Sequence, residues 1–126
     1  MDPQQRSILE TVYLALENAG LTSEMVTGSA TSVYVGSSSL DYAMMQCKDP
    51  LRMPMDPALG IARSMMASRV SSCFDFHGPS MVLDSSCSDG LAAVELACQS
   101  IWRGDVEMVS RIRFPNNAPN FHRHLQ

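Results

Sequence analysis

The residues that decide the fold lie at positions 78–90 and read Gly78-Pro79-Ser80-Met81-Val82-Leu83-Asp84-Ser85-Ser86-Cys87-Ser88-Asp89-Gly90. Residues 80–84 are typical of a short buried strand. From Ser88 onward the apolar spacing predicts a helix buried nearly all round, with one face made by Leu91, Val94, Ala97, Cys98 and Ile101. Between strand and helix the chain turns sharply at Cys87. The sequence therefore predicts a strand–turn–helix unit that presents the Cys87 side chain beside the helix N–H groups.

A thiol in this position has the features of a nucleophile. The helix N-terminus favours the thiolate, and the same helix N–H groups can hold the oxyanion formed when the thiolate attacks a thioester. Small neighbours leave room for a substrate arm. The alternative is a buried and inert cysteine, the commonest fate of a free thiol. Cys47, Cys73 and Cys98 have no comparable turn, and we predict that they are structural.

Local patterns on either side of this unit predict the other elements. A helix begins at Asp2 and Pro3, with Gln5 completing a variant capping box, and ends at Gly20. Its apolar face is predicted to contain Ile8, Leu9, Val12, Leu16 and Ala19. The sequence also predicts a loop over residues 21–30, a strand over 31–36 and a helix over about 61–71. The Pro-rich and Met-rich residues 37–60 are expected to form a long loop with one helical turn.

Composition limits the classes of protein that fit. The 126 residues suffice for one domain, with 45% hydrophobic and 17% charged residues. The net charge of −4 argues against nucleic-acid binding, and no apolar run has the ~20 residues needed to cross a bilayer. We expect no secretory signal and a cytoplasmic protein with free thiols. Neither metal-ligand spacing nor a phosphate-binding glycine loop is present, so no bound metal or cofactor is expected.

Several short motifs resemble, in the right order, the modular ketosynthase domains of polyketide synthases: Asp2-Pro3-Gln4-Gln5-Arg6, Ala15-Leu16-Glu17-Asn18-Ala19-Gly20, Val33-Tyr34-Val35-Gly36, Asp41-Tyr42, Ala67-Ser68-Arg69-Val70-Ser71 and Phe74-Asp75 through Gly78-Pro79-Ser80. Asp84-Ser85-Ser86-Cys87-Ser88 looks like the nucleophile motif of that family. The resemblance covers residues 1–109 and is closest to fungal reducing iterative synthases. Residues 110–126 diverge from it and are predicted to be a disordered tail.

The resemblance implies an α/β, thiolase-like fold that is normally a homodimer. This chain would hold its N-terminal part and lack the first core strand and the C-terminal half. In the family, the cysteine takes an acyl chain from the phosphopantetheine arm of an acyl carrier protein. A malonyl-type extender on the carrier then loses carbon dioxide, and the resulting carbanion attacks the acyl-cysteine thioester. Only the role of the cysteine carries over residue by residue, onto Cys87.

The chain departs from the family pattern at several positions. The family usually has Ala where Ser86 stands, Ser where Asp89 stands and Asn where Ser68 stands. An acid at position 89 is expected to oppose thiolate formation. The motifs of the two catalytic histidines are absent, and none of the histidines present replaces them. His77 is predicted to have a turn role, and the last two, His122 and His124, form an incidental pair in the tail.

Three hypotheses therefore remain open. The chain is a truncated ketosynthase, from a fragmentary gene model or a decayed gene, that cannot complete the condensation alone. Alternatively, it is a non-catalytic interaction module that pairs with an intact synthase subunit or a carrier protein. The third hypothesis is an independent thiol enzyme such as a cysteine hydrolase, which requires a base near Cys87.

Overall fold

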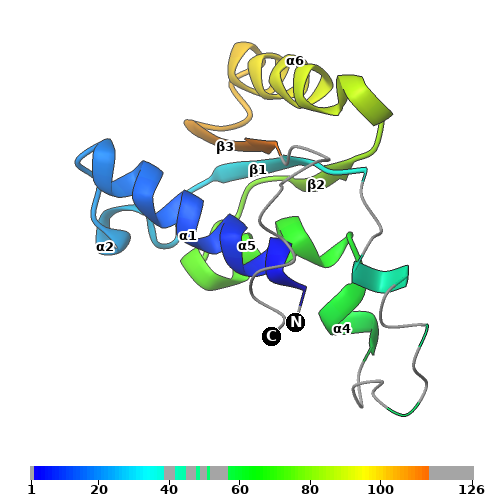
Figure 1. Cartoon of the computed structure of the whole chain (residues 1–126). Helices are drawn as coiled ribbons and strands as arrows, with labels where there is room; N and C mark the ends of the chain where they lie inside the picture. Colours follow the sequence, from blue (N-terminus) through cyan, green and yellow to red (C-terminus); the bar gives the residue numbers. More distant parts are fainter. Residues whose placement is uncertain (1, 39–41, 45–47, 49–50, 52–56, 114–126) are drawn as a thin grey trace.

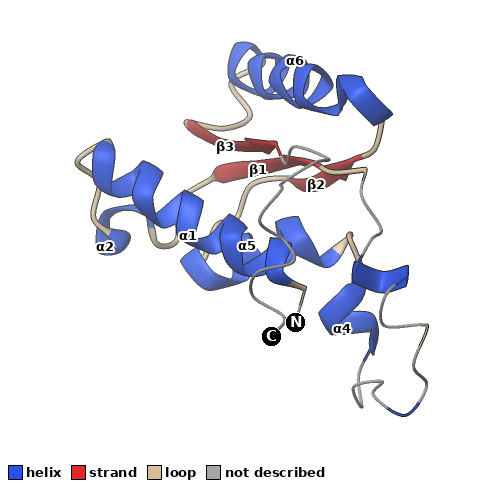
Figure 2. Cartoon of the chain, viewed as in Figure 1, coloured by secondary structure: helices blue, strands red, loops and turns tan. Residues whose placement is uncertain are grey.

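The computed structural model describes residues 2–38, 42–44, 48, 51 and 57–113 (Figure 1). Three strands form a parallel sheet in the order β2-β1-β3. Helix α6 covers one face of the sheet, and helices α1 and α5 cover the other (Figure 2). The predicted α/β class is confirmed.

Strand β1 (Thr31–Gly36) is the central strand, and its alternating side chains divide the core. Val33 and Val35 pack in one cluster with α1 and α5, while Tyr34 packs with Ala93 and Ala97 of α6. This alternation follows from the period of two residues in a strand. The strand predicted over residues 31–36 is confirmed, with both of its faces buried.

Helix α1 (Pro3–Asn18) begins as the sequence predicts. The Asp2 side chain accepts a hydrogen bond of 2.8 Å from the Gln4 N–H, and Gly20 has a positive φ of 73° just beyond the helix. The Gln5 side chain, however, does not complete a capping box. It donates to the Gly60 carbonyl at 3.4 Å, and the Asp2 N–H donates to the same carbonyl at 2.8 Å. These two long-range bonds connect the start of α1 to α4 (Pro57–Ile61).

The middle of the chain differs from the predicted helix over 61–71. Helix α5 (Met65–Phe74) starts later because turn bonds at Ala62 and Arg63 separate it from α4. It ends at Asp75, which has a left-handed φ of 54°. A further short helix, α2 (Ser23–Val26), lies within the stretch predicted as a loop. Residues 37–60 contain masked positions, so the predicted long loop lies partly outside the described residues.

Strand β2 (Ser80–Leu83) was predicted to be buried, and this prediction is wrong. Within the described residues it lies at an edge of the sheet and pairs with β1 alone, in the register Val33↔Ser80 to Gly36↔Leu83. Its first two side chains are exposed and its last two are half-buried. An edge strand has one neighbour, which explains the exposure.

Strand β3 (Met108–Arg113) corrects the predicted start of the tail at residue 110. Residues 110–113 pair with β1, where Val33 lies opposite Ser110 and Gly36 opposite Arg113. Ile112 is buried in the core with α1 and α5. A buried apolar side chain and a complete ladder therefore outweigh the polar composition that suggested disorder. Residues 114–126 lie outside the described part.

Helix α6 (Asp89–Trp102) follows the prediction in extent but not in orientation. The face on the sheet is made by small and polar residues: Asp89, Gly90, Ala93, Ala97 and Ser100. Small side chains let the helix approach the strands closely. Large apolar side chains point outward, and Leu91 is 74%, Ile101 50% and Trp102 82% exposed. The predicted burial nearly all round is therefore wrong.

Candidate functional site: the Cys87 elbow

The elbow, defined as residues 84–89, connects β2 to α6. A short 3-10 helix (Ser86–Ser88) lies between them, and Cys87 is its central residue. The Cys87 thiol is free and exposed, so the burial expected for an inert cysteine is not observed. The sharpest turn falls at Ser86, whose left-handed φ is 59°, one residue earlier than the sequence predicts. A non-glycine residue in this region is strained and needs support from its surroundings.

Short-range hydrogen bonds supply part of this support. The Ser85 carbonyl accepts from the Ser88 hydroxyl at 2.9 Å and from the Ser88 N–H at 3.4 Å. The Asp89 N–H donates to the Ser86 carbonyl. Because the N–H groups of Ser88 and Asp89 are engaged in this way, the Cys87 N–H is the better candidate donor to an oxyanion.

Ser86, the residue before Cys87, contacts both the thiol and Asp84. The Ser86 hydroxyl lies 3.9 Å from the Cys87 Sγ, and the Ser86 N–H donates a long hydrogen bond of 3.5 Å to Oδ1 of Asp84. The other Asp84 oxygen, Oδ2, lies 2.6 Å from Nη1 of Arg63 in an ion pair. Sequence reasoning missed Arg63, since nothing in its local pattern indicates a partner 21 residues away.

A close approach of backbones fixes the start of α6 on the sheet. A Cβ atom added at Gly36 would lie 3.0 Å from the Asp89 carbonyl carbon and 3.2 Å from the Gly90 nitrogen. A glycine at position 36 therefore allows the first turn of α6 to lie directly on the end of β1. Asp89, expected from sequence to oppose the thiolate, is buried in this contact region.

A second close approach lies at the other end of β2. A Cβ atom at Gly78 would come within 2.5 Å of the Thr31 carbonyl. Next to it, His77 donates its N–H to the Ser29 carbonyl at 2.9 Å, and its exposed Nε2 lies 3.3 Å from the Asp75 carboxylate. His77 thus belongs to the turn before β2, as predicted, and β2 separates it from the elbow.

The other candidate residues do not join Cys87. Cys73 is exposed on α5 and Cys98 is half-buried on α6, and the structural role predicted for both stays a prediction. Cys47, His122 and His124 lie outside the described residues. Among the residues that are described, no group of three or more His, Cys, Asp or Glu side chains is placed to hold a metal ion. The described helices include none long and apolar enough to span a membrane.

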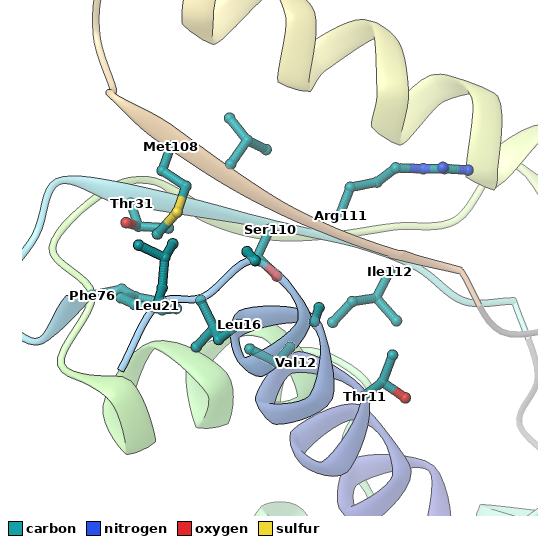
Figure 3. A pocket seen from close by; sticks show the side chains of 13 residues that line it. Thr11, Val12, Leu16, Leu21, Thr31, Phe76, Met108, Ser110, Arg111 and Ile112 are labelled. Atoms are coloured by element: carbon teal, nitrogen blue, oxygen red, sulfur yellow. The ribbon is translucent and has the colours of Figure 1, made fainter. Parts of the chain in front are cut away.

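A cavity of about 270 Å³ lies away from the elbow, between α1 and β3 (Figure 3). Val12 and Leu16 of α1 line it opposite Met108 and Ile112 of β3, whereas Arg111 points away from α1 (Figure 3). No elbow residue contributes to its walls. The exposed thiol is therefore approached from solvent rather than through this cavity.

Comparison with known proteins gives a family match and several similar chains. Residues 1–109 match the model of the family described as beta-ketoacyl synthase, N-terminal domain. The chain is 45% identical over 123 residues to the highly reducing polyketide synthase alnA of Emericella nidulans, covering 96% of this chain and 5% of that protein. It is 52% identical over 104 residues to the hybrid PKS-NRPS synthetase LUC5 of a Fusarium species, covering 82% of this chain and 3% of that protein.

Among solved structures, the chain is similar to the oxazolomycin ketosynthase domain OzmH KS7 of Streptomyces albus JA3453. The two share 36% identity with a TM-score of 0.70, over 86% of this chain and 18% of that chain. This likeness confirms the predicted thiolase-like fold. The chain spans 5% or less of the length of the two curated relatives named above. On the match over residues 1–109 and these identities, the chain belongs to the beta-ketoacyl synthase family.

Proposed function

We propose that Cys87 is the acyl-accepting nucleophile of a beta-ketoacyl synthase of polyketide assembly. The observation that carries this proposal is the exposed thiol at a strand–turn–helix elbow, in a chain of that family. The thiol lies in the turn before α6, where the helix N-terminus favours a negative charge. An exposed position also admits a flexible substrate arm.

The first step is an acyl transfer. The Cys87 thiolate attacks the carbonyl carbon of an acyl chain carried as a thioester on the phosphopantetheine arm of an acyl carrier protein. The Cys87 N–H stabilises the oxyanion of the tetrahedral intermediate. The carbon–sulfur bond to the carrier then breaks, and the carrier thiolate takes the proton that Cys87 lost. Cys87 is left as an acyl thioester.

The second step is a decarboxylative condensation. A malonyl group on the carrier loses carbon dioxide, and its carbanion forms a carbon–carbon bond with the acyl carbonyl while the bond to Cys87 breaks. The product is a β-ketoacyl carrier two carbons longer. His77 is the only histidine within the described residues, and β2 separates it from the elbow. We therefore propose that this chain alone performs the first step and not the second.

The same proposal names the partners. The acyl carrier protein delivers the chain to Cys87, and the family context favours a homodimer. A free nucleophilic thiol also suits a reducing, cytoplasmic location. No directly bound cofactor is required, because phosphopantetheine belongs to the carrier.

The test uses a hexanoyl thioester of phosphopantetheinylated carrier protein as the acyl donor. Mass spectrometry of peptides from the incubated chain should show one hexanoyl group on Cys87, and Cys87→Ala should abolish it. Cys73→Ala is the matched control, because Cys73 is also exposed, and it should leave the acylation unchanged. Equal acylation of Cys73 and Cys87, or none of Cys87, would refute the proposal.

A second candidate function is a non-catalytic module that pairs with an intact synthase subunit. The outward row of Leu91, Ile101 and Trp102 on α6 favours it, because exposed large apolar side chains often mark interaction surfaces. Under this reading Leu91→Glu should weaken co-purification with the subunit, and Cys87→Ala should not. If the subunit co-purifies equally well with Leu91→Glu and with Cys87→Ala, this second function is contradicted.

A further inference from the structure

We propose that Arg63 is a positioning residue for the Cys87 nucleophile and acts through the Asp84 carboxylate. This inference rests on the proposed acyl-accepting role of Cys87. Asp84 is the first residue after β2 and uses both of its oxygens. Oδ2 forms the ion pair of 2.6 Å with Arg63, and Oδ1 accepts the long bond from the Ser86 N–H. One carboxylate thus connects Arg63 to the residue that precedes the thiol.

Arg63 reaches this point from a different part of the chain. It lies in the linker between α4 and α5, and its Nη1 also donates to the Ser37 carbonyl at 3.4 Å. Ser37 in turn donates its N–H to the Leu83 carbonyl at 3.0 Å, at the end of β2. One guanidinium therefore joins the carboxyl end of β1, at Ser37, to Asp84, where the elbow leaves β2.

The contacts from Arg63 through Asp84 to Ser86 hold a strained backbone conformation at Ser86. A serine with a φ of 59° relaxes unless its neighbours hold it there. The hydrogen bond to Asp84 Oδ1 holds its N–H, and the ion pair holds the carboxylate. Without Arg63, we expect the Asp84 side chain to rotate and Ser86 to relax. Cys87 would then lose its fixed position in the turn before α6.

A purely electrostatic effect of Arg63 predicts the opposite result for one variant. Asp84→Asn removes a negative charge near the thiol and keeps Arg63, so a through-space effect should speed the reaction of Cys87. Loss of positioning should slow it instead. Asp84 and Asp89 flank Cys87 within the elbow, and the guanidinium of Arg63 comes from the α4–α5 linker. The direction of the change in Asp84→Asn therefore separates the two explanations.

The experiment measures the alkylation rate of each cysteine by iodoacetamide as a function of pH, by peptide mass spectrometry. Cys73 serves as an exposed internal reference in every variant. We expect Arg63→Gln and Asp84→Asn to slow Cys87 at neutral pH by about two- to fivefold, the size of a helix-terminus interaction with a charge. The double variant should be no slower than either single one, because both break one connection.

Two controls make the result decisive. Arg63→Lys keeps a cation in reach of Asp84 and should restore most of the rate. Arg6→Gln breaks an exposed ion pair of 2.9 Å with Glu10 on α1, far along the chain from the elbow, and should change nothing. Half-buried Cys98 reports unfolding, since its alkylation rises if α6 detaches. If Arg63→Gln exposes Cys98, its Cys87 rate is set aside. The positioning role is then judged from the Cys87 alkylation rates of Asp84→Asn, expected to be slow, and Arg63→Lys, expected to be close to the wild type.

An unchanged Cys87 profile in both single variants, or a faster Cys87 in Asp84→Asn, would overturn the proposal. Failure of the proposed function gives a different signature. In that case the wild-type chain takes no hexanoyl group from the carrier protein, while its alkylation still depends on Arg63 and Asp84. Conversely, if Cys87 is acylated normally and its alkylation rate does not depend on Arg63 or Asp84, only the positioning role is refuted.

Discussion

The hydroxyl groups of Tyr34 and Ser100 form a hydrogen bond of 2.5 Å that joins the central strand β1 to helix α6. Both side chains are buried. Since α6 begins at the elbow, this bond sets the rotation and height of the helix on the sheet. It holds the far end of α6, while the contact at Gly36 holds the near end.

The first prediction concerns this hydrogen bond. Tyr34→Phe leaves the Ser100 hydroxyl buried without its partner, so we expect a loss of about 1–2 kcal/mol in the free energy of unfolding. Urea denaturation measures the loss. Tyr13→Phe is the matched control, because Tyr13 is 56% exposed on α1 and its change should lie within about 0.5 kcal/mol. Equal effects of the two substitutions would contradict the role of the buried bond.

The second prediction concerns Gly36. A methyl group at this position meets the Asp89 backbone at 3.0 Å, so α6 must shift away from β1. We expect Gly36→Ala to cost about 1–3 kcal/mol and to change the alkylation rate of Cys87. Gly104→Ala separates contact from backbone strain. Gly104 has a positive φ of 74° and no atom within 4 Å of an added Cβ, so this control should lower stability but leave Cys87 unaffected.

The third prediction concerns pH. Burial raises the pKa of the Asp2 carboxyl above its ordinary value of 3.8, and the hydrogen bond from the Gln4 N–H opposes this rise only in part. The folded chain then holds a proton on Asp2 more tightly than the unfolded chain does. The stabilising contribution of Asp2 is therefore present below pH 3.8 and is lost as the pH rises through the higher, folded-state pKa.

Asp2→Asn tests this directly, because asparagine caps a helix but does not titrate. Relative to Asp2→Asn, the wild type should lose stability as the pH rises from about 3.8, measured by denaturation at a series of pH values. Asp2→Ala does not titrate and also removes the cap, so it should be about 1 kcal/mol less stable than Asp2→Asn at every pH. If the stability of the wild type relative to Asp2→Asn increases with rising pH, the predicted sign is wrong.

The fourth prediction concerns strand β3. Ile112 packs against α1 and α5 in the core, so Ile112→Ala should cost about 2–5 kcal/mol. Leu91→Ala removes an aliphatic side chain from the exposed face of α6 and should change stability by less than about 0.5 kcal/mol. Slow amide hydrogen exchange over residues 108–113 is a second measurement. Fast exchange there, with a neutral Ile112→Ala, would mean that β3 is not part of the sheet.

Local patterns predicted the elements whose signals are local. The β-branched alternation around Tyr34, the cap at Asp2 and the glycine at position 20 each depend on neighbours within a few residues. The elbow at Cys87 was predictable for the same reason, because strand, small residues and helix follow one another directly. The sharp turn predicted at Cys87 falls one residue earlier, at Ser86, because the run of small residues does not specify which of them takes the positive φ.

The failures concern contacts between distant segments. The sheet-facing side of α6 was predicted from large apolar residues, but small residues at Gly90, Ala93 and Ala97 allow closer packing on the sheet. The Arg63–Asp84 pair was missed because its partners are 21 residues apart. The paired residues of β3 at positions 110–113 were missed because the register with β1 outweighs their polar composition.

The outward position of Trp102 makes the chain its own optical sensor. Trp102 is the single tryptophan of the sequence and is 82% exposed at the end of α6. Its indole emission therefore reports the polarity at one known place on the outer side of that helix. A partner that binds over this face of α6 and excludes water from Trp102 will shift the emission to shorter wavelength, without any label being attached.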